Sequence, residues 1–466
     1  MASRRSLRGL TLPLILAGAL TWGSPGAVGA APFEYWLPVA VNSPGLHETH
    51  WRTEAALLNL SCSQPANVQM LFYAGGTVLV RERALPPSSQ LVLPDVVGEV
   101  FGSASASGPL RILSSVPLVV AGRVYNQTPT GTLGQTMNGV GLSAGFPQGD
   151  AVLLPALREN PNFRSNLQIL NMGGGEATVR VRMVVGGREK IKEVIVPPRA
   201  LRHLQQPLRE VTSPATNAWV EVTIVKGEAV WPFASVVDNR TGDATTVTPL
   251  DLTSLPSQGW LGVVARVPGL SGTTWRTSLS LLNPAASDLS ARLRFFASSG
   301  GWQERHVNLR AGEQIIWEDV LEDLFGLSQA AGSLAIEADG EIASMARIFN
   351  QAPTGTFGQS VPLIVPGSTL GAGSSALLPF LRQGAAFRSN VDLVNTGGTA
   401  ALVRIAVFAE GAAAAAAVKP VPAGGRLRID EVFVKEAGLA EVGNGFAVFT
   451  VEQGDGLWFS GSVVDQ

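Results

Sequence analysis

The chain has 466 residues, of which 45% are hydrophobic and 15% charged, and its 52 glycines and 30 prolines are typical of a turn-rich β protein rather than a helical or disordered one. The formal net charge is −2 and no basic run occurs outside the N-terminal segment, which disfavours a nucleic-acid partner, because phosphates require a concentrated positive face. Cys62 is the single cysteine, so an intramolecular disulfide is excluded.

The first 30 residues predict a secretory signal. A stretch with three arginines precedes an apolar run, residues 10–22, and small residues ending at Ala30, after which we expect cleavage. The run is shorter than the roughly 20 residues that span a bilayer, and no later segment reads as a membrane span. We therefore expect an exported protein, periplasmic or extracellular, without a transmembrane segment after signal removal. Residues 3–7 also resemble a twin-arginine signal, so both export routes stay open.

A regular repeat divides the rest of the chain. A triplet of aromatic, arginine and hydroxyl residues recurs at equal intervals, at 51–53, 163–165, 275–277 and 387–389. An asparagine follows each triplet at the same distance, at Asn59, Asn171, Asn283 and Asn395. We call the interval between successive triplets the short period. Other segments match better at twice this interval, the long period, so the order is A-B-A-B and a two-part unit was duplicated whole.

Each repeat predicts a β-sandwich. Trp275, Thr277, Leu279 and Leu281 alternate with polar residues, which is the period of a strand with one buried face, and Trp51 and Trp275 alternate like core residues. A second strand follows the asparagine, with Val179, Val181, Met183 and Val185 on its apolar side. Residues 318–326, and residues 95–102 in the first copy, predict one helical turn in each A repeat.

We therefore expect an all-β fold of four tandem immunoglobulin-like β-sandwich domains in an A-B-A-B arrangement. The expected boundaries are a signal peptide at 1–30, A1 at 31–145, B1 at 146–254, A2 at 255–369 and B2 at 370–466. These four names are kept below for the four residue ranges.

Residues 395–405, followed by residues 421–425, resemble the strand, Asn-Gly turn, strand pattern of immunoglobulin-like repeats in bacterial secreted and surface proteins. The resemblance extends over essentially the whole mature chain. It implies an extracytoplasmic setting and a role in adhesion, spacing or accessory binding, and it transfers no catalytic residue. The cysteine pair of antibody-type domains is absent.

The sequence offers weak signals for chemistry. Residues 141–145 match the five-letter pattern of a nucleophile elbow around Ser143, but no apolar-periodic helix follows. Of the four histidines only His47 and His50 are close in sequence, and the second copy has no histidine at either position. We therefore predict no catalytic residue, no cofactor and no metal site, and we expect that the protein is not an enzyme.

One polar segment is better preserved between the two A repeats than the strands are. Residues 126–135 reappear as residues 350–359, with two differences. This predicts a loop of fixed backbone geometry, which either contacts a ligand or docks an A domain on its B domain; docking is favoured, because the loop leads into each A-to-B linker. The candidate residues are Asn126, Gln127, Gly131, Gln135, Asn350, Gln351, Gly355 and Gln359.

Four arginines recur with the repeat, on the strand face opposite the aromatic residue, at Arg52, Arg164, Arg276 and Arg388. They predict either a cationic stripe for an acidic glycan or protein, or arginines that lie over a sheet and pair with neighbouring carboxylates, which is the commoner situation.

The sequence favours an exported, non-catalytic binding, adhesion or spacer protein with a protein or glycan partner. One alternative is a carbohydrate-binding accessory protein, for which Trp260, Trp302 and Trp317 are the candidate exposed aromatic residues. The other alternative is a secreted hydrolase.

Overall fold

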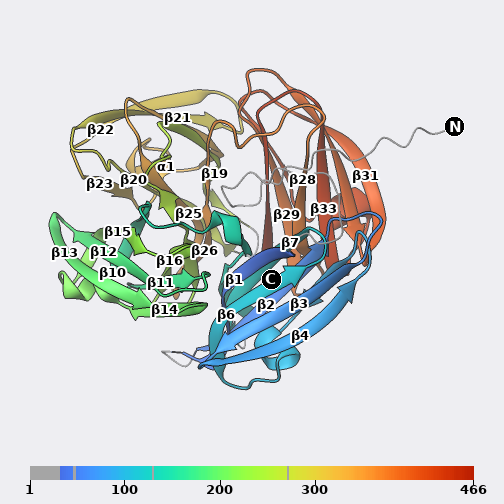
Figure 1. Ribbon diagram of the computed structural model, residues 1–466. Helices are drawn as coiled ribbons and strands as arrows, with labels where there is room; N and C mark the ends of the chain where they lie inside the picture. The colour runs from blue at the N-terminus through green and yellow to red at the C-terminus, as the bar shows by residue number, and fades with distance from the viewer. Residues whose placement is uncertain (1–31, 46–48, 129–130, 270–271, 466) are drawn as a thin grey trace. The chain divides into compact units, whose positions relative to one another are not determined.

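The computed structural model describes residues 32–45, 49–128, 131–269 and 272–465 (Figure 1). The chain is all-β, as the sequence predicts, with its strands in several separate sheets and only short helical turns. Its backbone contacts divide it into two compact units, residues 33–87 with 91–363 and residues 88–90 with 364–466. The count of four immunoglobulin-like domains stays a prediction, and the expected signal, residues 1–30, lies outside the described residues.

The strands of A1 form one continuous hydrogen-bonded path, because its first strand changes partner along its length. β1 (Phe33–Pro44) pairs mostly with β6 (Ala106–Ser114), but its last residues pair with β2 (His50–Asn59). In A2, β19 (Gln258–Pro268) divides in the same way between β24 (Ala330–Ala338) and β20 (Thr274–Leu282). The other strands of A1 and A2 are β3 (Ala66–Ala74), β4 (Thr77–Leu85), β5 (Gln90–Leu93), β7 (Leu118–Thr128), β8 (Gly131–Thr136), β9 (Val140–Gly141), β21 (Leu289–Ala297), β22 (Trp302–Leu309), β23 (Gln314–Trp317), β25 (Ala343–Ala352), β26 (Gly355–Val361) and β27 (Leu363–Ile364).

B1 and B2 each hold two sheets. The order in B1 is β13-β12-β15-β10-β18 in one sheet and β14-β11-β16-β17 in the other, and in B2 it is β28-β33-β30-β31 and β32-β29-β34. The B1 strands are β10 (Ala151–Glu159), β11 (Phe163–Asn171), β12 (Ala177–Val185), β13 (Arg188–Val196), β14 (Ala200–Gln205), β15 (Ala215–Lys226), β16 (Val230–Asp238), β17 (Ala244–Val247) and β18 (Leu250–Asp251). The B2 strands are β28 (Ser375–Gln383), β29 (Phe387–Asn395), β30 (Ala401–Ala409), β31 (Ala412–Val421), β32 (Arg426–Ile429), β33 (Val442–Gln453) and β34 (Leu457–Asp465).

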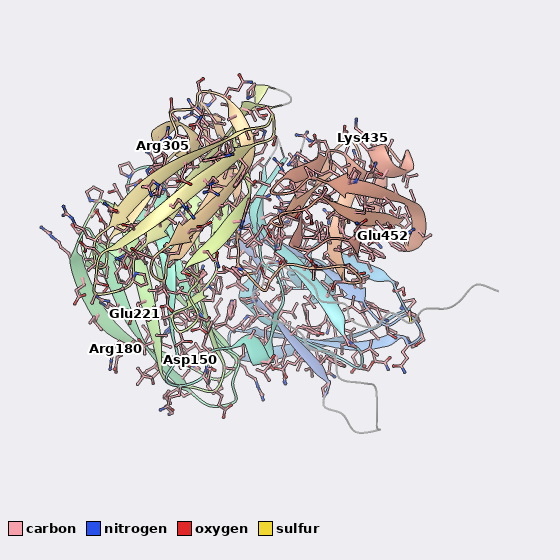
Figure 2. The ribbon with its side chains drawn as sticks, turned by 90° about the horizontal axis from the view of Figure 1, so that it is seen from above. Asp150, Arg180, Glu221, Arg305, Lys435 and Glu452 are labelled. Atoms are coloured by element: carbon pink, nitrogen blue, oxygen red, sulfur yellow. The ribbon has the colours of Figure 1, made fainter. Side chains whose placement is uncertain are left out.

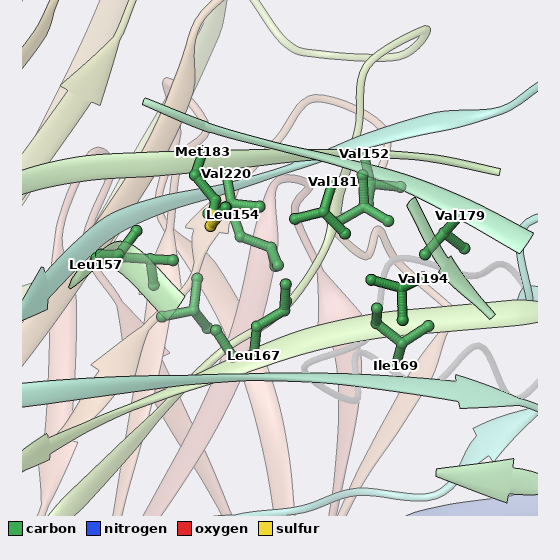
Figure 3. Packing of buried hydrophobic residues seen from close by; sticks show 14 of the residues in the cluster. Val152, Leu154, Leu157, Leu167, Ile169, Val179, Val181, Met183, Val194 and Val220 are labelled. Carbon is green, nitrogen blue, oxygen red and sulfur yellow. The ribbon is translucent and has the colours of Figure 1, made fainter. Parts of the chain in front are cut away.

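Apolar side chains fill the space between the facing sheets. In B1, Val152 and Val181 of one sheet face Leu167 and Ile169 of the other, and all four are buried (Figure 3). The predicted apolar side of β12, from Val179 to Val185, lies in the same cluster, so that prediction is confirmed. Burial of one such side chain stabilises the fold by about 1.5–3 kcal/mol, so packing rather than a disulfide holds the sheets together; Cys62 is free and exposed.

The recurring asparagine ties two turns together inside each repeat. Nδ2 of Asn283 donates to the carbonyls of Ser287, Leu309 and Arg310 at 2.8–3.2 Å, while its Oδ1 accepts from the amide of Ala285 at 3.0 Å. Asn59, Asn171 and Asn395 make corresponding bonds. All four asparagines are buried, so the short period marks a structural clasp.

The recurring hydroxyl hydrogen-bonds the backbone of the first strand of each repeat, where a β-bulge interrupts the ladder. The register of β10 shifts between Leu154 and Leu157 and again before Glu159. Ser165 Oγ accepts from the amide of Arg158 at 2.9 Å and donates to its carbonyl at 2.8 Å. Thr53, Thr277 and Ser389 bond the corresponding strands. A bulge leaves backbone groups without a ladder partner, and the hydroxyl supplies one.

Short helical turns pack against the strands; in the A repeats they contact the first two strands. The expected turns are confirmed as α1 (Val320–Asp323) and as one turn of π-helix, η1 (Val96–Val100), each with buried apolar residues. The sequence did not predict α2 (Val432–Ala437) in B2 or the 3₁₀ turns η2 (Leu142–Ala144) and η3 (Pro207–Glu210).

Charged side chains such as Arg180, Lys435 and Glu452 are exposed at the surface (Figure 2). Among the described residues, no helix has the length and hydrophobicity needed to cross a bilayer.

We predict that Asn283→Ala lowers the free energy of unfolding by about 3 kcal/mol, because three carbonyls and one amide lose their buried partner. Denaturant unfolding of the purified variant measures this. The control is Asn308→Ala, an exposed asparagine of the same repeat, which should change stability by less than about 0.5 kcal/mol. Equal stabilities of the two variants would contradict the clasp.

Glu159 is a buried carboxylate at the end of β10. It accepts from the amides of Leu208 and Arg209 at 2.9 and 3.1 Å. Burial raises its pKa from the ordinary value of 4.5 to about 7, and the two amides oppose this rise. The corresponding position of B2 is Gln383, which does not titrate.

The pH dependence of stability should follow from this shift. Between pH 4.5 and pH 7 the folded state holds a proton on Glu159 that the unfolded chain has released, so the contribution of Glu159 to stability falls as pH rises through this range and is constant outside it. The contribution is about 3 kcal/mol. Glu159→Gln should make the fall in stability between pH 4.5 and pH 7 shallower by this amount, and Gln383→Glu should make it steeper by a similar amount, measured by denaturant unfolding at several pH values. Identical pH profiles for the wild type and Glu159→Gln would refute the assignment.

Candidate functional site

The repeated polar segment forms a β-hairpin, not the loop that its polar sequence suggests. Residues 126–128 end β7 and pair with residues 131–133 of β8, and residues 350–352 of β25 pair with residues 355–357 of β26 in the same register. Glycine, threonine and amide side chains hide the strand period here, because they give no apolar alternation.

Of the candidate residues, Asn126 and Asn350 serve their own repeat. Their Oδ1 atoms accept from the amides of His50 and Thr274, each at 2.8 Å, and so fix the start of β2 and β20. Gln127 and Gln351 are exposed and donate to the carbonyls of the residues that follow them.

The glycines of the hairpin are required by its geometry. Gly131 and Gly355 have φ values of 141° and 133°, a region that side chains disfavour. A Cβ on Gly134 would lie 2.2 Å from the carbonyl oxygen of Val124, and one on Gly358 would lie 2.3 Å from that of Ile348. The hairpin therefore accepts no side chain at these positions.

Both copies of the hairpin contact the same part of B1. Gln135 of β8 donates to Ser235 Oγ at 2.9 Å and accepts from Thr246 Oγ1 at 3.1 Å, so the first hairpin contacts the repeat that follows it. The second hairpin contacts the turn that joins β16 to β17, in the repeat before it, through Thr356. Gln359, the counterpart of Gln135, is exposed.

A buried ion pair joins B1 to A2 beside this turn. Arg347 Nη2 lies 3.0 Å from Asp243 Oδ2, and its other nitrogens donate to Thr245 Oγ1 and Thr356 Oγ1. The same Asp243 oxygen accepts from the amide of Gly358 at 2.8 Å. Burial raises the pKa of Asp243 to about 6, although Arg347 opposes the rise, and burial lowers the pKa of Arg347.

A second polar clasp links the same two repeats. Gln314 Oε1 accepts from the amide of Ala156 at 2.9 Å, and Gln314 Nε2 donates to Asn217 Oδ1 and to the carbonyl of Ala218. Ala156 has a φ of 60°, which turns its amide out of the β10 ladder. Gln314 recurs only at the long period, as Gln90. A search at the short period, which found the other polar residues, therefore could not find it.

The four recurring arginines are placed differently. Arg164 is buried and donates to Asn239 Oδ1 at 2.9 Å; burial lowers its pKa. Arg276 Nε lies 3.8 Å from Asp319, and Nε of Arg52 is buried without a hydrogen-bond partner among the described residues. Arg388 is half-buried on β29. Arg164 and Arg276 line two different clefts, so these two do not share one stripe.

The cleft between B1 and A2, which we call the B1–A2 cleft, has a volume of about 360 Å³ and mixes charges of both signs. Arg158 pairs with Glu318 at 2.8 Å, and Arg266 pairs with Asp319 and Glu322 at its edge. Its acidic residues are therefore largely neutralised within the protein.

The cleft between A1 and B1, which we call the A1–B1 cleft, is larger, about 830 Å³. Trp51 lies in its wall, half-buried, so the expectation that Trp51 and Trp275 are core residues is wrong. A Cβ on Gly45 would lie 2.4 Å from Trp51 Nε1, and one on Gly269 would lie 2.5 Å from Trp275 Nε1. Each indole is thus packed against a loop rather than between the sheets.

Two of the three candidate tryptophans share one sheet face in A2. Trp260 stacks on Phe296 with ring centroids 5.1 Å apart, and Phe296 pairs across the strands with Trp302, which is 60% exposed. The Arg294 guanidinium lies 5.0 Å from the Trp302 ring centre. Trp317 lies on β23 against the core, away from this face. We call Trp260, Phe296 and Trp302 the aromatic face.

The structure does not bring the candidate nucleophile Ser143 or the histidines together into a catalytic or metal-binding group. Ser143 is exposed on η2, and the next element is the strand β10 rather than a helix. His50 Nε2 contacts Asn42 Oδ1 at 2.8 Å, and His47 lies outside the described residues. Within the described ranges, no group of three or more His, Cys, Asp or Glu residues could hold a metal ion.

A double-mutant cycle tests the ion pair between B1 and A2. Asp243→Ala and Arg347→Ala should each lower the free energy of unfolding by about 3–5 kcal/mol, because each leaves a buried charge unpaired, and the coupling energy between them should exceed about 1.5 kcal/mol. Denaturant unfolding measures all four species. Asp243→Ala combined with Arg180→Ala, at an exposed arginine, should be additive within about 0.5 kcal/mol. Additivity for Asp243 and Arg347 would refute the pairing.

No protein-family model and no curated protein matches the chain. Among solved structures, a Thermotoga maritima protein (1070) is 13% identical, with a TM-score of 0.20 over 24% of this chain and 94% of that one. A tetra-tandem repeat from the extending region of a large adhesion protein is 12% identical, with a TM-score of 0.11 over 92% and 98%. A family 32 glycoside hydrolase from Bifidobacterium adolescentis is 9% identical, with a TM-score of 0.14 over 91% and 98%. Likenesses at these TM-scores support no argument about function.

Proposed function

We propose that the chain is an exported, non-catalytic binding, adhesion or spacer protein of the cell envelope or extracellular space. Its mature part comprises four tandem immunoglobulin-like β-sandwich domains in an A-B-A-B order, with the boundaries that the sequence predicts. The kinship that this proposal implies is with immunoglobulin-like repeats of bacterial secreted and surface proteins.

The use of the recurring polar residues is the observation that carries the proposal. Asn283 clasps turns and Thr277 completes a bulged strand, and beside these recurring residues Arg347 holds A2 against B1. Asn283 and Thr277 are fully buried, the Arg347 side chain is 12% exposed, and all three are bonded within the protein, so they support a fixed array of sheets. A spacer or adhesion protein requires such an array, because it must keep its binding surfaces at set separations.

The repeated hairpin is proposed to dock neighbouring domains. Gln135 bonds Ser235 and Thr246 from one side, and Thr356 bonds Asp238 with both its amide and its hydroxyl at 2.9 Å from the other. B1 is thereby held between A1 and A2 within the unit that contains residues 91–363. Polar contacts of this kind are typical of interfaces between domains.

The aromatic face favours a second candidate, a carbohydrate-binding accessory protein. An exposed indole beside two stacked rings offers the flat apolar surface on which the C–H face of a sugar ring packs. In A1 the corresponding pair is Trp36 and Tyr73, stacked at 5.6 Å, but Trp36 is buried and the exposed tryptophan is replaced by Val78. The two A repeats thus differ on this surface while sharing a fold.

Glycan and protein arrays probed with residues 31–466, alongside a screen with chromogenic esters, glycosides and peptides, test the proposed function. We expect saturable binding to at least one array ligand and no turnover above a blank. Turnover by homogeneous protein would overturn the proposal in favour of the hydrolase, and an array without any bound ligand would leave only the spacer role.

The variant Trp302→Ala tests the second candidate, a carbohydrate-binding accessory protein. Trp302→Ala should leave stability within about 0.5 kcal/mol, since its side chain is exposed, while glycan binding through the aromatic face should fall about tenfold or more. Val78→Ala, at the corresponding position of A1, is the matched control and should leave binding to the aromatic face unchanged. Unaltered glycan binding by Trp302→Ala would remove the aromatic face from the binding surface.

A further inference from the structure

The A1–B1 cleft has one wall made from the outer face of a B1 sheet. Arg164, Asn166 and Gln168 alternate along β11 with core residues and therefore point away from the core. Asn166 pairs across the strands with Gln205 on one side and Ser235 on the other, and Gln168 pairs with His203. This wall is a polar platform in which amide, hydroxyl and imidazole groups stand in cross-strand rows.

The opposite wall comes from A1 and is less polar. The aromatic residues Trp51 and Tyr73 line it, together with the aliphatic residues Val39 and Val41 of β1. Tyr73 is held in place by its stack on Trp36. The cleft thus sets aromatic and aliphatic surface against a row of side-chain amides, which is the composition that recognises a flat polyhydroxylated ring.

The charge of the A1–B1 cleft is one-sided. Arg164 and Arg199 line it, and none of its lining residues within the described ranges is Asp or Glu. Arg164 is 6% exposed, and among the described residues its guanidinium forms no ion pair; its hydrogen bond goes to the neutral amide of Asn239. The neighbouring carboxylate, Asp238, attracts the Arg164 charge from a distance and so partly opposes the lowering of its pKa, but its own hydrogen bonds go to Thr356 and to the amides of Arg240 and Thr241. A buried cation in this setting is best stabilised by an anion from outside.

In B2 the corresponding sheet face carries charged residues that pair with one another. The place of Gln168 is taken by Asp392 and that of His203 by Arg428. Asp392 accepts from Arg426 Nε at 2.7 Å and from Arg428 Nη1 at 3.0 Å. Two copies of one sheet face have therefore diverged, one towards an internal ion-pair cluster and the other towards amides beside a buried cation.

We propose that the A1–B1 cleft binds an acidic oligosaccharide, with Arg164 and Arg199 on its carboxylates, the amides of Asn166, Gln168 and Gln205 on its hydroxyls, and Trp51 or Tyr73 against a ring face. This inference rests on the proposed binding function and names the ligand class. A volume of about 830 Å³ accommodates a ligand of a few sugar units. Planar guanidinium groups suit carboxylates, and amides supply a paired donor and acceptor for vicinal hydroxyls.

An acidic peptide is the competing ligand. The platform favours a saccharide, because its polar groups are mostly side-chain amides on the face of a sheet. It offers neither the unpaired backbone of a sheet edge, which pairs with an extended peptide, nor a dense arginine cluster, which binds an acidic motif.

Isothermal titration of residues 31–466 with tetragalacturonate tests the inference. The wild type should bind saturably, more weakly at high salt, and at least tenfold more tightly than it binds the methyl-esterified tetrasaccharide, which lacks the charge. Arg164→Gln and Gln168→Asp should each weaken binding at least tenfold, the second because it places a carboxylate in the cleft. Arg199→Gln, at an exposed position where folding is not at risk, should weaken binding at least threefold.

The duplication supplies the control. Arg388→Gln changes the corresponding arginine of B2 and should leave the affinity within twofold of the wild type. Circular dichroism and thermal unfolding of each variant separate a lost site from a lost fold.

Each other result overturns a defined part of the inference. Equal affinity for the esterified tetrasaccharide would refute charge recognition, and equal affinity for tetraglutamate would refute the saccharide. If array ligands bind the wild type and the Arg164, Gln168 and Arg199 variants alike, the binding function stands and this site is wrong. If tetragalacturonate fails to bind while other array ligands do, the ligand class is wrong.

Discussion

Every repeat of this protein depends on one buried side-chain amide. Asn283 and its three counterparts each bridge the turn that follows the second strand to the turn that leaves the fourth. These turns carry backbone carbonyls that the sheets cannot satisfy, and a buried carbonyl without a donor costs about 1–3 kcal/mol. An amide can donate to several carbonyls and accept from one backbone amide at once, which an apolar residue of the same size cannot do.

The contacts between neighbouring repeats in residues 91–363 extend the same principle. A small apolar cluster that includes Leu153, Trp219 and Leu282 lies between B1 and A2, but the directional contacts are polar: Gln314 against Asn217, and Arg347 against Asp243. Separating the two repeats would expose this cluster, and it would also break a desolvated ion pair and several side-chain to backbone bonds. Polar clasps of this kind fix one orientation, because hydrogen bonds depend on angle and apolar contacts do not.

The sequence was sufficient for the strand class, the recurring positions and the helical turns of the A repeats, because these depend on period-two burial and local apolar spacing. It failed where polar residues form strands: the segments from Asn126 and from Asn350 are hairpins, hidden by glycine and threonine. It also placed Trp51 in the core, since alternation alone does not tell a buried end of a strand from one that a loop covers. Clefts between repeats join residues that are distant in the chain, such as Trp51 and Arg164, and no local pattern encodes such pairs.

The duplication separates residues that maintain the fold from residues free to specialise. The clasping asparagine and the bulge-binding hydroxyl keep one chemistry in all four repeats, because their partners are backbone groups that every copy possesses. At outward positions of the sheets the copies diverge: Gln168 stands against Asp392, and Val78 against Trp302. Since the fold tolerates both versions, folding does not dictate which residue stands at these positions. The surfaces that distinguish the repeats are therefore where binding specificity can be acquired without cost to the core.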